Sequence, residues 1–140
     1  MKKYLLITAL LFISISILAQ QKPAYILYNA KGKKVSYKKM IKQLAQKDII
    51  LFGEYHNNAI AHWLELAVAK DLSEKRGLVF GAEMFEADNQ QALNGYLAGK
   101  ITAKGLDTAA RLWSNYKTDY APIVNFAKEK QLSFIATNIP

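Results

Sequence analysis

Residues 49–53 read Ile-Ile-Leu-Phe-Gly, and the polar run Glu-Tyr-His-Asn-Asn follows directly at 54–58. A short continuous apolar run is typical of a parallel strand that is covered on both faces. Two later segments repeat this pattern, Leu-Val-Phe-Gly-Ala at 78–82 and Ser-Phe-Ile-Ala-Thr at 133–137. Because helical patterns separate the three runs, the sequence predicts an α/β fold, a parallel sheet with covering helices built from βαβ units.

The segments around these strands carry turn and helix signals. A long helix should follow the polar run and reach about Arg76, with Ile60, Trp63 and Leu72 on its apolar stripe. Asp88 with Gln91 matches a capping box for a later helix. In chain order, we expect a hairpin at 24–35 and helices that begin at Ser36, at Asn57 or Asn58, and at Asp88. A further helix over residues 102–113 and one that begins at Thr118 or Asp119 should follow.

The sequence stops at Pro140, directly after the third predicted strand. A central apolar strand without its covering helix would leave one face of the sheet bare. We therefore expect residues 48–140 to be the N-terminal half of a domain, so that the domain is incomplete. A basic hairpin and helix at 20–47 and a signal peptide at 1–19 should precede it.

The first 19 residues have the pattern of a secretory signal peptide. Lys2 and Lys3 precede an apolar run that ends at Leu18, and the small Ala19 stands at the boundary. We expect cleavage near Ala19 and export to the periplasm or cell envelope. The chain has no cysteine, which excludes disulfides and Cys nucleophiles and predicts that the exported protein is not a lipoprotein.

The net charge of +8 is concentrated near the N-terminus. Residues 22–47 hold eight lysines and no acid, whereas residues 48–140 hold nine basic and eleven acidic residues. Nucleic-acid-binding surfaces usually interleave arginine and aromatic residues over a longer face, so we do not expect nucleic acid as a partner. The Lys31–Lys47 patch is either solvated surface or a site that attracts an anionic surface, lipid or ligand.

Polar residues follow each predicted strand, at the edge where open parallel sheets bind ligands. They include Glu54, His56 and Glu83, and His62 lies about one turn into the next helix. His56 and His62 with a glutamate could form a metal site or a general-base cluster, or be structural residues. Side chains that could ligate haem iron are His56, His62, Tyr55, Tyr116, Tyr120 and Met84; the aromatic residues Trp113, Tyr116 and Tyr120 could wall a flat ligand or belong to the core.

Three ordered blocks of the sequence resemble the ChaN-like haem-binding uptake family of the Tiki superfamily. Residues 50–58 with His62 are similar to its opening motif, residues 83–99 to its second block, and residues 113–140 to its third. The chain departs from the family pattern at Asn57, Ala59 and Ala61, where Asp, Pro and His are usual. The match runs from about Asp48 to the last residue.

The resemblance implies an exported, iron-regulated protein of bacterial haem and iron uptake, which binds haem at the carboxyl edge of the sheet and is not expected to be an enzyme. It also implies a homodimer that stacks two haems face to face, with a tyrosine as iron ligand. The alternative is a metal-dependent hydrolase, peptidase- or esterase-like, that uses Mn, Co or Zn. For haem the candidate residues are His56, His62, Tyr55, Glu83, Tyr116 and Tyr120; for the hydrolase, Glu54, His56 and Glu83 would be catalytic, and Glu54, His56 and His62 would hold the metal.

Overall fold

The computed structural model describes residues 23–140, so the expected signal peptide lies outside the described residues. The chain divides into two units, with the boundary between Lys34 and Val35. Across residues 23–140, the structure has no helix that is both long and apolar enough to cross a membrane.

A small hairpin forms the described part of the first unit and its boundary. Strand β1 (Leu27–Tyr28) pairs with β2 (Lys34–Val35). The side-chain oxygen of Asn29 accepts hydrogen bonds from the backbone N–H groups of Lys31 and Lys33, both at 3.0 Å. Gly32 takes a left-handed conformation with φ of 70°, which glycine adopts without steric cost. The predicted hairpin at 24–35 is confirmed.

Two helices open the second unit, and each begins at a polar cap. In α2 (Tyr37–Leu44) the Ser36 hydroxyl accepts from the backbone N–H of Lys39 at 3.3 Å. In α3 (Ala59–Ser73) the Asn58 side-chain oxygen accepts from the N–H groups of residues 60 and 61. The two helices pack together through an apolar cluster of Ile41, Val68 and Leu72, with Tyr37, Met40, Leu44, Ile50, Phe52, Leu64 and Leu78 around it.

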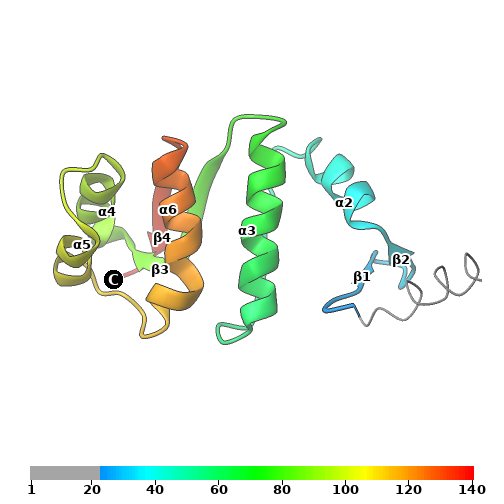
Figure 1. The fold of residues 1–140 in the computed structure, drawn as a ribbon, viewed down its shortest axis with the longest axis horizontal. Coiled ribbons are helices and arrows are strands. Elements are labelled where there is room, and N and C mark those ends of the chain that lie inside the picture. Colours follow the sequence, from blue (N-terminus) through cyan, green and yellow to red (C-terminus); the bar gives the residue numbers. More distant parts are fainter. Residues whose placement is uncertain (1–22) are drawn as a thin grey trace, which may run out of the picture. The chain divides into compact units, whose positions relative to one another are not determined.

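The sheet consists of β3 (Val79–Glu86) and β4 (Ser133–Asn138), which pair in parallel with Val79 opposite Ser133 (Figure 1). Parallel pairing through a helical crossover confirms the predicted α/β fold. The crossover contains α4 (Gln90–Leu97), α5 (Ala103–Ala109), a π-helical turn (Tyr116–Tyr120) and α6 (Ala121–Glu129).

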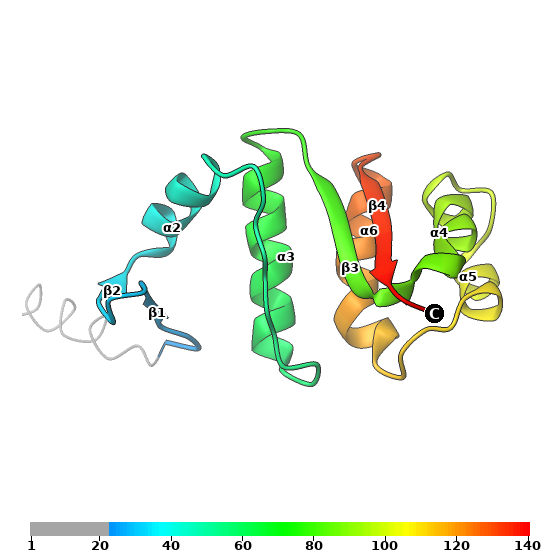
Figure 2. The same ribbon diagram turned by 180° about the vertical axis from the view of Figure 1, so that it is seen from behind.

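Helices cover only one face of this sheet. Phe80, Phe134 and Ala136 point into the main core, which α3, α4, α5 and α6 complete. Figure 2 shows β3 and β4 from the other side, where no described helix lies over them. Val79 and Ile135 are exposed on that face. One face of the sheet is therefore uncovered among residues 23–140. The sequence predicts this, because no helical segment follows the third predicted strand.

The predicted strand at 49–53 does not pair with the sheet. The segment runs along α3 (Figure 2) and is not part of a strand. Ile50 and Phe52 contact the α2–α3 cluster, whereas Leu51 is 92% exposed. The apolar residues therefore alternate between a packed side and a solvent side. The run lacks the second covering layer and the neighbouring strand that the sequence pattern predicts.

Three local predictions are wrong for reasons of tertiary packing. The capping box at Asp88 is absent because Arg111 binds Asp88 and Glu86 instead, which lowers the pKa of the Asp88 carboxyl. The helix expected at 102–113 is the shorter α5. In the first turns of α3, Ile60 and Trp63 are 43% and 54% exposed, whereas His62 is buried; Leu72 of the predicted stripe is buried as expected.

Candidate functional site

A cluster of polar side chains surrounds Glu54, which directly follows the 49–53 segment. The Tyr120 hydroxyl donates to Glu54 Oε1 at 2.9 Å, and His56 Nδ1 lies 2.9 Å from the same oxygen. The Glu54 side chain is 11% exposed. A carboxylate oxygen accepts hydrogen bonds, and we therefore assign the proton of this contact to His56 Nδ1. Glu54 thus joins the loop at 54–58 to the π-helical turn.

This contact leaves the second ring nitrogen of His56 available. The His56 side chain is 58% exposed, and its ring packs edge-on against Trp113 at 4.7 Å between centroids. With the proton on Nδ1, Nε2 carries a lone pair that can bind a metal ion. A carboxylate that holds the other ring nitrogen orients the imidazole and makes it a better ligand.

The backbone of His56 is held from two further directions. His62 Nε2 lies 3.1 Å from the His56 carbonyl oxygen, and Asn115 Nδ2 donates to the same oxygen at 2.5 Å. Asn115 Nδ2 also lies 2.8 Å from Asp119 Oδ2. His56 therefore has a fixed main chain and a fixed Nδ1, although much of its ring faces solvent.

His62 is a buried member of the cluster. Its side chain is 4% exposed, its ring contacts Tyr120 at 4.7 Å, and its Nε2 lies 3.7 Å from Glu54 Oε2. His62 Nδ1 and Glu54 Oε2 are buried without a hydrogen-bond partner. Burial raises the pKa of Glu65, which lies 4.0 Å from His62 Nδ1. Smaller electrostatic effects of His62 and Glu54 lower and raise this pKa, respectively. The cluster thus brings partly buried carboxylates close to a buried imidazole.

The two tyrosines of the π-helical turn are core residues. Tyr116 packs against Phe85 at 5.8 Å between ring centroids. Burial raises the pKa of both Tyr116 and Tyr120, and for Tyr120 the hydrogen bond to Glu54 adds to this rise. Both phenols therefore lie within the core instead of facing solvent.

The other candidates lie apart from the cluster. Tyr55 is 81% exposed in the same loop, and Met84 is buried in the core. The sequence predicts that Glu83 converges with Glu54 and His56, but no hydrogen bond or ion pair within residues 23–140 joins them. Strand β3 continues to Glu86 instead of ending at Ala82, so strand alternation places Glu83 on the exposed face.

The metal alternative receives no support from this geometry. Among residues 23–140, no three His, Asp or Glu side chains are placed so that they could hold a metal ion. Glu54 Oε1 is already shared by the Tyr120 hydroxyl and His56 Nδ1.

Sequence reasoning missed three residues of the cluster: Asn115, Asp119 and Glu65. They come from segments that the sequence does not place near residue 54. A signal was present in the i,i+4 spacing of Asn115 and Asp119, but the π-helical turn that brings Tyr120 to Glu54 has no sequence signature of its own.

The residues present fit a haem group at one position. His56 offers an exposed, oriented imidazole nitrogen, and Trp113 lies against its ring. Imidazole is a common axial ligand of haem iron, and aromatic residues are common in the walls of cofactor sites. The site needs no rearrangement of its buried hydrogen bonds to present this nitrogen.

Comparisons with known proteins agree with this chemistry. A family model described as "Haem-binding uptake, Tiki superfamily, ChaN" matches residues 40–140. A solved structure described as "Cofacial heme binding to ChaN of Campylobacter jejuni" is similar, with a TM-score of 0.67 and 25% sequence identity; the match covers 83% of this chain and 49% of that chain. No curated protein sequence matches. The chain thus spans about half the length of the Campylobacter structure, and it belongs to the ChaN family of haem-binding uptake proteins in the Tiki superfamily.

Proposed function

We propose that this protein binds haem and that His56 is the iron ligand, through Nε2. The observation that carries the proposal is the pairing of Glu54 with His56 Nδ1 at 2.9 Å on a side chain that is 58% exposed, which leaves Nε2 without a hydrogen-bond partner among the described residues. When bound, haem supplies an iron centre that takes a nitrogen or oxygen ligand from the protein.

The structure supports His56 over most other candidates. His62, Met84, Tyr116 and Tyr120 are all buried, whereas the side chain of His56 is 58% exposed. Tyr55 is the remaining exposed candidate in this loop, and it is the second choice. Both choices place the haem beside residues 54–58, beyond the carboxyl end of the 49–53 segment, where α/β folds commonly bind ligands.

A hemin titration tests the ligand. Wild-type protein should give a shifted, saturable Soret band whose spectrum indicates histidine coordination. His56→Ala should remove that signature and weaken hemin binding at least tenfold. Tyr55→Phe should keep both, and Asn57→Ala is a matched control at the adjacent loop position. A normal spectrum in His56→Ala combined with a loss in Tyr55→Phe would assign the iron to the tyrosine.

The same titration tests haem binding itself. If wild-type protein gives no saturable spectral change at micromolar hemin, the haem proposal fails for every candidate ligand. Circular dichroism of each variant shows whether the fold survives the substitution, so a loss of binding can be attributed to the missing side chain.

We further propose that the protein is exported and takes part in haem uptake. The signal-peptide pattern of residues 1–19 and the uptake description of the matching family support this role. Mass spectrometry of the envelope fraction should find a mature N-terminus near Gln20, and expression should rise when iron is limiting. Full-length protein in the cytosol, with expression independent of iron, would argue against export and uptake.

We also propose that two copies of the protein pair around haem. The similar Campylobacter protein binds haem cofacially, and this likeness supports a paired arrangement here. Light scattering after chromatography, with and without hemin, should show a mass that doubles on hemin addition. An unchanged monomer mass at saturating hemin would contradict the paired arrangement.

A further inference from the structure

Helix α2 carries a face of lysines, which we call the α2 lysine face: Lys38, Lys39 and Lys42. All three are exposed, and they share one side of the helix because residues three and four apart are neighbours on its surface. The other side of α2 packs on α3 through its apolar residues, which are Tyr37, Met40, Ile41 and Leu44. The lysine face therefore points away from the packed side of the helix.

No neighbouring acid neutralises the α2 lysine face. Residues 22–47 hold eight lysines and no Asp or Glu. Within residues 23–140, the lysines that form ion pairs are Lys117 and Lys130. A helix face that serves only as solvated surface commonly mixes charges of both signs at these spacings, because like charges one turn apart repel each other. The uncompensated charge points to an anionic partner.

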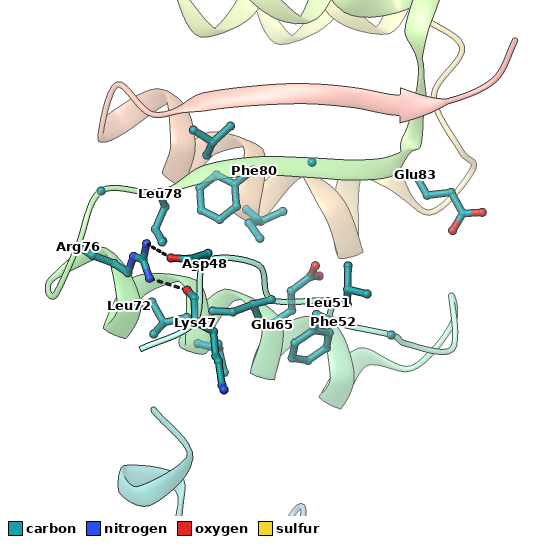
Figure 3. Close-up of a pocket in the computed structure, with 17 residues that line it drawn as sticks. Lys47, Asp48, Leu51, Phe52, Glu65, Leu72, Arg76, Leu78, Phe80 and Glu83 are labelled. Carbon is teal, nitrogen blue, oxygen red and sulfur yellow. Dashed lines mark hydrogen bonds and ion pairs between the residues drawn. The ribbon is translucent and has the colours of Figure 1, made fainter. Parts of the chain in front are cut away.

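Contacts with the end of α3 fix the chain directly after α2. Arg76 donates hydrogen bonds to the main-chain oxygens of Ala45 and Lys47. The same side chain lies 3.9 Å from Asp48, the first acid after the lysines, and it lines a slot of about 620 Å³ between residues 50–53 and strand β3 (Figure 3). Asp48 thus pairs with Arg76 and not with the lysine face, and α2 is held on α3 from both its apolar side and its end.

The hairpin that precedes α2 in the chain has a similar composition. Lys31, Lys33 and Lys34 are exposed on it, and Ile26 and Tyr28 are 48% and 56% exposed. Tyrosine and aliphatic side chains close to lysines are typical of segments that lie at a membrane–water interface, where the apolar parts enter the headgroup region. The hairpin by itself therefore favours a lipid surface.

The exclusive use of lysine selects among the anionic partners. Residues 22–47 contain no arginine. Arginine pairs bidentately with phosphates and carboxylates, whereas the lysine ammonium is a hydrated point charge without a fixed binding geometry. Lysine is depleted in protein–protein interfaces, and nucleic-acid-binding surfaces use arginine and aromatic residues. Clusters of about four to eight basic residues commonly bind anionic lipid headgroups, so a fluid lipid surface fits this segment best.

We propose that the α2 lysine face binds the anionic headgroups of a lipid surface, and that the hairpin offers a second contact of the same kind. The attraction is electrostatic, so the contact is reversible and is weakened by salt. The proposal does not depend on haem binding, because none of these lysines belongs to the cluster around Glu54.

Vesicle co-sedimentation of the hemin-free full chain tests the lipid surface. Binding to phosphatidylcholine vesicles with about 30% phosphatidylglycerol should be at least about tenfold tighter than binding to phosphatidylcholine alone. Raising the salt from about 0.05 M to about 0.5 M should remove this difference. Vesicles without phosphatidylglycerol measure any binding through the apolar run in residues 1–19. Equal binding to both kinds of vesicle at low salt would overturn the proposal. Binding to poly-glutamate without binding to the anionic vesicles would assign the lysines to an acidic protein, which also overturns it.

Two triple variants of equal net charge locate the binding surface. The first combines Lys38→Gln, Lys39→Gln and Lys42→Gln. The control removes three exposed lysines elsewhere and combines Lys75→Gln, Lys100→Gln and Lys104→Gln. The first variant should bind the anionic vesicles at least about tenfold more weakly than wild type, and the control should stay within about twofold. Circular dichroism shows whether both variants keep the fold. An equal loss in the two variants would assign the binding to net charge alone, and the proposal fails.

Discussion

At the residue scale, the site depends on Glu54. Its Oε1 holds the hydroxyl of Tyr120 and Nδ1 of His56, each at 2.9 Å. These contacts decide which histidine nitrogen faces solvent, and they join the 54–58 loop to the π-helical turn. The two histidines therefore have different roles: His56 presents a nitrogen, whereas His62 supports the His56 carbonyl from within the core.

Tyr120→Phe should destabilise the protein by about 1–2 kcal/mol, because the substitution removes a hydrogen bond to a largely buried carboxylate. Tyr55→Phe is the matched control: Tyr55 is 81% exposed, and surface substitutions usually change stability by less than about 0.5 kcal/mol. Urea denaturation measures both. Equal midpoints for the two variants would show that the contact with Glu54 does not contribute to stability.

Glu65 should make stability depend on pH. Burial raises its pKa in the folded state, so the folded protein binds this proton more tightly than the unfolded chain does. The resulting stabilisation is complete below the unfolded pKa and is lost as the pH rises through the folded value. Glu65→Gln, which cannot ionise, should therefore have a higher Tm than wild type at about pH 7 and a similar Tm at about pH 4. A Tm difference that is independent of pH would contradict this explanation.

At the element scale, α3 determines the geometry of the 54–58 loop. The helix begins directly after Asn58, and the Asn58 N–H also donates to the Tyr55 carbonyl at 2.8 Å. The start of α3 and the end of the loop are thus one hydrogen-bonded unit. The position of His62, one turn into the helix, follows from this start and allows its ring to reach the His56 carbonyl.

Asn58→Ala should cost about 1 kcal/mol, because the first-turn N–H groups of α3 lose their side-chain acceptor. Asn58→Asp keeps an acceptor at the same position and should retain most of the stability. Chemical denaturation compares the three proteins. If Asp is no better than Ala at this position, the cap is not the source of the effect.

Two predicted helix caps have different outcomes in the structure. The sequence predicts Ser36 as a cap, and its hydroxyl accepts a bond from Lys39 N–H, because such a contact depends only on neighbours along the chain. The Asp88 cap is wrong because Arg111, 23 residues away, binds that carboxylate. Competition from a distant partner is not visible in a local pattern.

At the scale of the whole molecule, the helices among residues 23–140 cover one face of the sheet. Phe134 is 2% exposed beneath the helices, whereas Leu51 is 92% exposed on the segment beside β3. Both belong to apolar runs that look alike in the sequence. Their environments differ because Phe134 faces the main core under the crossover helices, whereas the 49–53 segment contacts the α2–α3 cluster through Ile50 and Phe52 and turns Leu51 to solvent.

Leu51→Lys should change the stability of the chain by less than about 0.5 kcal/mol, because the side chain already faces solvent. Phe134→Ala should cost about 3–5 kcal/mol, because it removes a fully packed ring and leaves a cavity. Thermal or urea unfolding measures both variants. A loss of several kcal/mol in Leu51→Lys would show that the face is covered in solution.

Much of the fold was predictable from the sequence, and less of the site. The apolar runs at 78–82 and 133–137 predict the two strands that pair in parallel, although β3 continues to Glu86, and apolar periodicity predicts the helices between them. The grouping of His56 with Glu54 was anticipated by their spacing. Asn115 and Asp119 were not, because they reach the site through a turn whose geometry depends on packing against α3.

The sequence by itself determined the α/β class, the apolar strands, the cap of α2 and the histidines beside an acidic residue, because each depends on periodicity or on close neighbours along the chain. Only the tertiary structure decided that His62 is buried, that Tyr116 and Tyr120 are core phenols, that Glu83 lies away from Glu54, and that residues 49–53 face a slot instead of β3. These outcomes depend on contacts between residues that are far apart in the sequence, and a local sequence pattern does not specify such contacts.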